Sequence, residues 1–203
     1  MIIGLDLAGS KKGKTGFALL DDSLGTRTKV LRTDKEIIDE TMMQEGLITI
    51  DAPLGLPKGR CCLDYNCKCV RYGYSREAEK ELRKMGIRVF PCGFAGMRQL
   101  TMRGIKLKKY FERKGREVIE TYPGSAQDIL GIPRKGKDCR KLQRALIKYG
   151  FKGEVKKKEI TDHELDAITS AFVGKLHNQG KTIALGIKKE SQIITARPKT
   201  NKK

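Results

Sequence analysis

Short apolar runs that end at turn residues open the chain. Residues 2–7 and 17–20 are two such runs, and residues 26–33 follow with alternating polar and apolar positions. Runs this short, bounded by Gly, Asp and Ser, predict β-strands rather than helices. Three strands in succession, with no helix between them, predict an antiparallel meander.

The rest of the chain alternates between helical and strand periodicity. Asp34 and Ser75 are suited to cap helices, and Thr161 with Glu164 forms a capping-box pattern. A strand that follows a crossover helix favours parallel pairing with an earlier strand. Helices are predicted over 34–44, 75–86, 95–114, 124–130, 138–149 and from 161 onward, and strands over 47–51, 117–123, 182–187 and 192–195, the last two as a hairpin.

The turn after the first strand is compatible with two folds. Residues 8–15 (Ala-Gly-Ser-Lys-Lys-Gly-Lys-Thr) fit a loose phosphate-loop pattern, but such a loop needs a following helix to hold the phosphates. The apolar run at 17–20 is too short for that helix. The pattern therefore favours an α/β fold with an RNase H-like mixed sheet, in which a three-strand antiparallel meander and parallel strands are flanked by helices.

The length of 203 residues suits one domain. We expect a single RNase H-like domain over 1–197, with a Cys-rich insertion or lid at about 57–74 and a basic tail at 198–203. No apolar run reaches the roughly 20 residues that cross a bilayer. The N-terminal residues also lack the order of a signal peptide, so a cytoplasmic protein without a membrane partner is expected.

Positive charge dominates the composition. The chain carries 43 Lys and Arg against 24 Asp and Glu, a net charge of +19. This excess favours nucleic acid as partner, because cationic side chains release counterions from its phosphates. A charged surface of the heat-adapted kind is the alternative, but it would not explain the imbalance. The candidate nucleic-acid contacts are the lysines of the first turn and of one helix face: Lys11, Lys12, Lys14, Lys106, Lys108 and Lys109.

Acidic residues stand within or at the ends of apolar strands. Asp6, Asp51 and Glu120 occupy such positions, and Asp166 lies near the start of the last helix. Each acid alone has a structural explanation, such as a lysine partner, a turn or a helix cap. Carboxylates brought together, however, repel unless cations neutralise them, and Mg²⁺ and Mn²⁺ take oxygen ligands. Two such ions stabilise the attacking and leaving oxygens in phosphodiester hydrolysis. Further candidates nearby are Asp162 and Glu164 as ligands and His163 as an orienting or protonating group.

Four blocks of the sequence resemble, in order, those of a widespread uncharacterised family described as predicted RNase H-like nucleases. They are 3–10 (Ile-Gly-Leu-Asp-Leu-Ala-Gly-Ser), 50–57 (Ile-Asp-Ala-Pro-Leu-Gly-Leu-Pro), 118–123 (Val-Ile-Glu-Thr-Tyr-Pro) and 162–168 (Asp-His-Glu-Leu-Asp-Ala-Ile). The resemblance implies a resolvase-like RNase H fold and a catalytic metal set of Asp6, Asp51, Glu120 and Asp166. The cysteine-dense stretch departs from the family pattern.

Four cysteines fall within nine residues of this stretch: Cys61, Cys62, Cys67 and Cys69. Four thiolates can hold a structural Zn²⁺ ion tetrahedrally, although the spacing does not form two Cys-x-x-Cys pairs. Cys92 could replace one member. Free thiols, or a disulfide if the source is a hyperthermophile, are the alternatives.

Three functions are compatible with these features. The favoured one is a Mg²⁺- or Mn²⁺-dependent nuclease that hydrolyses phosphodiester bonds of DNA or RNA. The second is an ATP-binding protein of the actin and sugar-kinase superfold, whose first phosphate motif is also a strand Asp followed by a Gly/Lys hairpin. A chain of this length would then have to form a homodimer. The third is a non-catalytic nucleic-acid-binding protein whose acids serve only structure.

Overall fold

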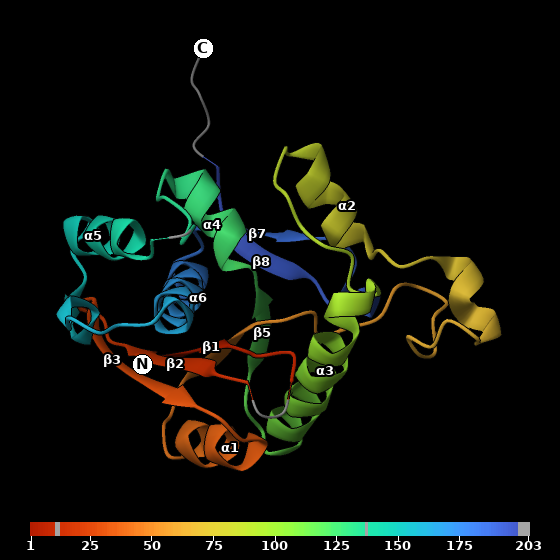
Figure 1. Ribbon diagram of the computed structural model, residues 1–203, viewed down its shortest axis with the longest axis horizontal. Helices are drawn as coiled ribbons and strands as arrows, with labels where there is room; N and C mark the ends of the chain where they lie inside the picture. Colours follow the sequence, from red (N-terminus) through yellow and green to blue (C-terminus); the bar gives the residue numbers. More distant parts are fainter. Residues whose placement is uncertain (11–12, 137, 199–203) are drawn as a thin grey trace.

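A computed structural model describes residues 1–10, 13–136 and 138–198 and shows a mixed sheet between two layers of helices (Figure 1). The strand order is β6-β3-β2-β1-β4-β5-β8-β7. The strands are β1 Ile2–Asp6, β2 Thr15–Leu20, β3 Gly25–Leu31, β4 Leu47–Asp51, β5 Val118–Thr121, β6 Lys152–Gly153, β7 Thr182–Leu185 and β8 Ile193–Ala196.

The predicted meander is confirmed. β1 pairs antiparallel with β2, and β2 pairs antiparallel with β3. β4 and β5 then add in parallel on the other side of β1, and β8 adds in parallel to β5. This is the mixed RNase H-like sheet that the sequence predicts. Residues 15–20 form a strand, so the first turn is not followed by the helix that a Walker-type phosphate loop requires.

The helices follow the predicted ranges with shifted ends. They are α1 Asp34–Met42, α2 Glu77–Lys84, α3 Arg98–Arg113, α4 Pro123–Leu130, α5 Arg140–Tyr149 and α6 Asp162–Asn178. Thr33 caps α1 in place of Asp34, since its hydroxyl accepts from the Glu36 N–H. Arg76, not Ser75, is the N-cap residue of α2. The capping box at the start of α6 is confirmed.

Short 3₁₀ turns complete the described part of the chain: η1 Lys68–Tyr72, η2 Ala95–Met97, η3 Glu154–Lys156 and η4 Lys188–Glu190. The predicted helix 95–114 therefore begins as a 3₁₀ turn. The predicted hairpin near the C-terminus is confirmed, with β7 antiparallel to β8.

Apolar residues on opposite faces of the strands form two cores. Ile2, Ala18 and Leu20 pack with α5 and α6 on one face. Ile3, Leu5 and Phe17 and their neighbours pack with α1 and α3 on the other face. The alternation of strand side chains produces both faces, and Figure 1 shows α6 and α1 on opposite sides of the meander.

Residues 57–74 project from the sheet at the right of Figure 1. Their regular structure is the single 3₁₀ turn η1. Among the described residues, none of the helices combines the length and apolar character that a membrane crossing requires.

Candidate active site

Two aspartates meet at the same edge of the sheet. Asp6 ends β1 and Asp51 ends β4, and the parallel register pairs these two residues directly. Their strands are buried on both faces, so each backbone is fixed by the core. Only 7% of Asp6 is exposed. The convergence of these two predicted acids is therefore set by strand register.

Burial and mutual repulsion disfavour ionisation of this pair. Burial raises the pKa of the Asp6 carboxyl, and the charge of Asp166 raises it further. Burial likewise holds the pKa of Asp51 well above its usual range, with Asp6 and Asp166 adding to the shift. Raised pKa values in acids that share a pocket are typical of functional sites.

Helix α6 brings further acids to the pair because it lies directly on the sheet. A Cβ at Gly16 would lie 2.0 Å from the backbone oxygen of His163, and a Cβ at Gly4 would lie 2.0 Å from that of Ala167. Only glycine permits this approach. As a result, Nδ1 of His163 lies 2.7 Å from Oδ2 of Asp6.

Lys135 is a member of this cluster that sequence reasoning missed. Its Nζ lies 2.8 Å from Oδ2 of Asp166 and 3.4 Å from Oδ2 of Asp162. Oδ1 of Asp166 accepts from Nε2 of Gln127 at 2.9 Å. Although burial lowers the pKa of Lys135, the charges of Asp166, Asp6 and Asp162 raise it overall. Lys135 lies in a loop rich in charged residues, so its position in the sequence does not distinguish it. The only available signal was that the clustered acids need a cation to neutralise them.

Glu120 is held in a separate buried ion pair. Both of its carboxylate oxygens accept from the guanidinium of Arg76, one at 2.7 Å and the other at 2.5 Å. The Leu54 N–H donates to one of them at 2.8 Å, and Nε of Arg76 also donates to Glu79 at 2.9 Å. Burial raises the pKa of Glu120, while Arg76 opposes that shift. Glu120 thus lies near the aspartates with its oxygens already occupied.

Glu164 points to the other side of the first turn of α6. Its carboxylate accepts from the hydroxyls of Thr28 and Thr161 and forms an ion pair with Lys157. Asp162, by contrast, shares Lys135 with Asp166. Of the two further candidates, Asp162 therefore lies with the acid cluster and Glu164 does not.

A pocket of about 180 Å³ opens beside the carboxylates. Asp6, Asp51 and Glu120 line its polar side, and Phe90 and Met97 are among its apolar residues. Phe90 is 65% exposed and stacks on Phe94, with ring centroids 5.6 Å apart. The four clustered cysteines do not line this pocket; they meet one another within residues 57–74.

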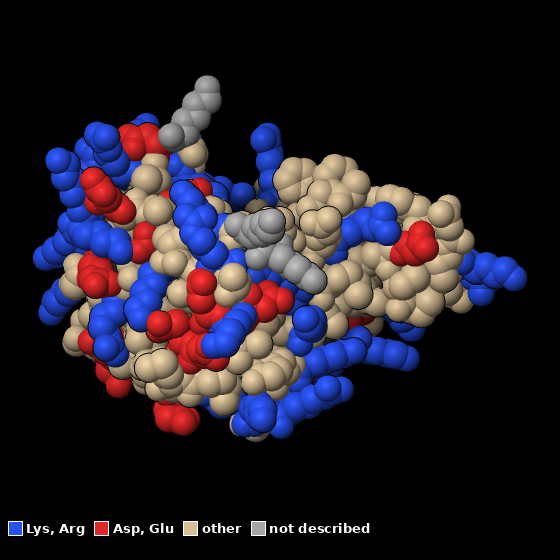
Figure 2. All heavy atoms as spheres, turned by 60° about the horizontal axis from the view of Figure 1, so that its bottom comes forward, with Lys and Arg blue, Asp and Glu red and all other residues tan. Residues whose placement is uncertain are grey.

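None of the described lysines predicted to contact nucleic acid lines the pocket beside the carboxylates. Lys14 and Lys109 are exposed, Lys106 lies 3.9 Å from Asp34, and Lys108 forms an ion pair with Glu112. Lys11 and Lys12 lie outside the described residues. Figure 2 shows Lys and Arg side chains over much of one face, with acidic side chains gathered near its middle.

The three aspartates match a hard divalent cation in ligand type. Asp6, Asp51 and Asp166 supply carboxylate oxygens, the ligand type that Mg²⁺ and Mn²⁺ prefer. Asp6 is buried and Asp51 is partly buried, and both have raised pKa values, a shift that a bound cation would reverse. Their donor atoms are not all within 4.8 Å of one another as described, and the Lys135 ammonium neutralises part of the charge.

Comparison with known proteins gives a distant structural similarity and no match in sequence. No protein-family model and no curated protein matches the sequence. Among solved structures, the chain is similar to Thermus thermophilus RuvC in complex with a Holliday junction substrate, with 12% identity and a TM-score of 0.42. The match covers 94% of this chain and 98% of that one. A similarity this distant carries no argument, and the RNase H-like α/β fold is assigned from the order and direction of the strands in this chain.

Proposed function

We propose that this protein is a divalent-metal-dependent nuclease whose reaction centre is formed by Asp6, Asp51 and Asp166. The observation that carries the proposal is the direct pairing of Asp6 with Asp51 on adjacent parallel strands. Ionising two neighbouring acids at this position costs free energy. Proteins keep such unfavourable arrangements chiefly at functional sites, so the pair supports a function that needs both carboxylates.

Asp6, Asp51 and Asp166 would hold Mg²⁺ or Mn²⁺, and a bound ion would polarise a phosphodiester and make water a stronger nucleophile. His163 has a different role. Its hydrogen bond to Asp6 raises the pKa of the imidazole, which keeps it protonated to higher pH. We propose that His163 holds Asp6 in place and supplies a proton to the leaving oxygen.

The rim of the pocket suits an unpaired nucleic-acid strand. Phe90, which is 65% exposed, lines the pocket together with Asp51. Proteins that bind single strands combine exposed aromatic rings with a cationic surface. The net charge of +19 supplies the latter. The substrate class proposed is therefore nucleic acid with an accessible single-stranded segment.

The test is a cleavage panel with Mg²⁺ and Mn²⁺ on single-stranded, duplex, junction and RNA–DNA hybrid substrates. Asp6→Asn and Asp51→Asn should keep binding and lower cleavage roughly 1000-fold, because a metal contributes several kcal/mol to the transition state. Asp22→Asn is the control, since Asp22 is a fully exposed acid paired with Lys175. Equal cutting by wild type, Asp51→Asn and Asp22→Asn would show that the activity comes from elsewhere.

A non-catalytic nucleic-acid-binding protein is the second candidate, and the Lys135 ammonium favours it. An ammonium within reach of Asp166 and Asp162 neutralises these acids without a metal. The same panel separates the two functions. Salt-sensitive binding with no metal-dependent cleavage of any substrate supports the second candidate and removes the first.

A further inference from the structure

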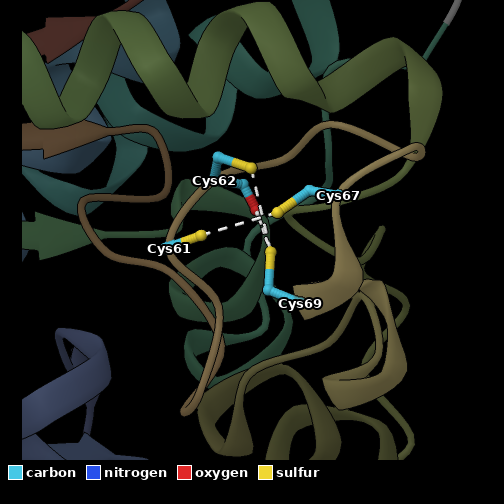
Figure 3. A group of neighbouring side chains, drawn as sticks. All are labelled: Cys61, Cys62, Cys67 and Cys69. Carbon is cyan, nitrogen blue, oxygen red and sulfur yellow. Dashed lines mark hydrogen bonds between the residues drawn. The ribbon is translucent and has the colours of Figure 1, made fainter.

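The insertion at residues 57–74 gathers four sulfur atoms at one point. The Sγ atoms of Cys61, Cys62, Cys67 and Cys69 all lie within 4.8 Å of one another, although the residues belong to two separate parts of the loop. Figure 3 shows the four side chains directed toward a common centre. In the described part of the chain, no other set of His, Cys, Asp and Glu residues meets that criterion.

The spacing matches a tetrahedral metal site. Sγ of Cys61 lies 3.7 Å from Sγ of Cys67, and Sγ of Cys62 lies 3.8 Å from Sγ of Cys69. Four sulfurs at about 2.3 Å from a zinc ion stand about 3.8 Å apart at the corners of a tetrahedron. All four cysteines are free thiols in this structure. The distances therefore match shared coordination rather than two disulfides, whose sulfurs would be about 2 Å apart.

The insertion also needs something other than an apolar core to fix its shape. Between residues 58 and 74 its buried side chains are Arg60, Leu63 and Cys69. The Arg60 guanidinium donates to the backbone carbonyls of Cys62, Asp64 and Gly73 at 2.8 to 3.3 Å. These bonds connect the two halves of the loop, but one aliphatic side chain is a small core. Small segments of this kind are commonly held by a metal.

Charge is consistent with a tetrathiolate centre. Four thiolates around Zn²⁺ carry a net charge of −2. The same segment has four basic residues against one acid, Asp64, and an anionic centre offsets part of that excess. The basic residues are Lys58, Arg60, Lys68 and Arg71.

From this geometry we propose that Cys61, Cys62, Cys67 and Cys69 bind one structural Zn²⁺ ion that orders the insertion. Binding converts the four thiols to thiolates and releases their protons; no electron is transferred. With all four ligand positions filled by protein, the ion has no open position for catalysis. The site is independent of the proposed nuclease activity.

The ion would also fix an aromatic surface. Tyr65, which lies between the two halves of the cysteine group, packs edge-to-face on Tyr74 with centroids 5.6 Å apart. Its hydroxyl donates to the Gly93 carbonyl at 3.4 Å. An ordered insertion therefore holds Tyr65 against the segment that carries Phe94, whose ring lines the same surface pocket.

The test uses the full-length chain, reduced and freed of metal under anaerobic conditions. Titration with Co²⁺ should give the visible and charge-transfer bands of a tetrahedral thiolate complex at one ion per chain. Zinc-edge X-ray absorption of the zinc-loaded chain should give four sulfurs at about 2.3 Å. Cys67→Ser should lose the four-sulfur signature, whereas Cys139→Ser, which removes a thiol outside the cluster, should keep it.

A measurement on wild type alone covers the case in which Cys67→Ser does not fold. Titration of the zinc-loaded protein with a mercurial thiol reagent should release one zinc ion per chain, detected with a coloured chelator. The proposal is wrong if the reduced chain binds no metal in a tetrahedral thiolate site. It is also wrong if nitrogen or oxygen ligands dominate the absorption spectrum, or if Cys139→Ser abolishes the site as Cys67→Ser does.

Discussion

Asp51 shows how one residue can cost stability. Its folded pKa is raised well above the ordinary value by burial and by Asp6. Below the unfolded pKa of about 4, both states are protonated and nothing is lost. As pH rises through that value, the unfolded state releases its proton first, so the free energy of unfolding falls until the folded carboxyl also ionises.

Asp51→Asn should therefore stabilise the protein at neutral pH. The expected gain is on the order of 1 kcal/mol, which is about 2–4 °C in Tm for a chain of this size. Thermal unfolding from pH 4 to pH 8 should show the gain growing with pH, and Mn²⁺ should reduce it by stabilising wild type. If Asp51→Asn is less stable than wild type at every pH, ionisation of Asp51 beside Asp6 does not destabilise the fold.

The contribution of His163 to the free energy of unfolding should depend on pH in the opposite direction. Its hydrogen bond to Asp6 raises the pKa of the ring, with the charges of Asp6 and Asp162 in support and Lys135 opposing. The protonated pair stabilises the folded state fully below the unfolded pKa of about 6.5. That contribution is lost as pH rises through the folded pKa.

His163→Gln should destabilise by roughly 0.5 kcal/mol at the acidic end, a small loss because His163 is partly exposed and the pair is screened. The loss should be smaller at alkaline pH, where the imidazole is neutral. The measurement is urea unfolding at about pH 5.5 and 9. His177→Gln serves as the control, since His177 contacts Thr182 rather than an acid. If the loss of stability is equal at both pH values, the ion pair between His163 and Asp6 is not its cause.

Individual residues also show what the sequence could predict about the site. Asp6 and Asp51 are recognisable because an acid inside an apolar strand needs an explanation. Lys135 and Arg76 are not, because a charged loop or a helix start can hold a lysine or arginine for many reasons. Their roles depend on which acids the folded chain brings to them. Only the tertiary structure shows that Arg76 occupies both oxygens of Glu120.

At the scale of elements, the position of α6 on β2 decides the site geometry. Gly16→Ala would place a Cβ 2.0 Å from a backbone oxygen of α6. Since that atom is not the end of a flexible side chain, the helix must shift. We expect a loss of about 1–3 kcal/mol in unfolding free energy, together with weaker Mn²⁺ binding by calorimetry. Gly96→Ala, whose Cβ would meet only Phe94 at 3.5 Å, should change neither quantity.

The ion pair between α2 and β5 can be tested by a double-mutant cycle. Arg76→Met leaves the buried carboxylates of Glu79 and Glu120 without their partner, so a loss of about 3–5 kcal/mol is expected. Glu120→Gln should also destabilise, and the double variant should lose less than the sum. Glu40→Gln, which breaks the surface pair with Lys29, should cost at most about 1 kcal/mol.

The same cycle tests the role of Glu120. If Glu120 serves only as the partner of Arg76, Glu120→Gln should lower stability, and the folded fraction should keep the proposed metal-dependent cleavage. If Glu120 were instead a metal ligand, Glu120→Gln would abolish cleavage with little loss of stability. Unfolding in urea and cleavage by the folded fraction therefore give opposite results under the two roles.

Elements were more predictable than their ends. The order of strands and helices follows from periodicity, and the parallel pairing of β1 with β4 follows from the crossover helix between them. The cap at Thr33 was missed because Asp34 beside it is equally suitable as a cap. The cap at Arg76 was missed because serine is a favoured N-cap residue and arginine is not, which pointed to Ser75. β6 was missed because its two residues are exposed and pair only with the first two residues of β3, so no local pattern marks them.

At the scale of the whole molecule, charge and exposed aromatic rings give separable predictions for nucleic-acid binding. A chain of net charge +19 should bind single strands with affinity that falls steeply as salt is raised. Phe90→Ala should weaken this binding by about 1–3 kcal/mol, because one stacked base loses its platform. The slope of log K against log salt should not change, since no cation is removed. Fluorescence anisotropy on oligonucleotides at several salt concentrations measures both quantities.

Met43→Ala is the matched control, because Met43 is 75% exposed and follows α1, outside the residues of the pocket. It should leave both affinity and slope unchanged. Lys109→Ala should differ from Phe90→Ala in the salt dependence. If Lys109 contacts a phosphate, its loss should lower the slope of log K against log salt by about one and weaken the binding of all nucleic-acid sequences equally. If Phe90→Ala lowered the slope, or if Met43→Ala weakened binding equally, binding would be a property of the general surface. The aromatic rim beside Asp51 would then have no part in holding the strand.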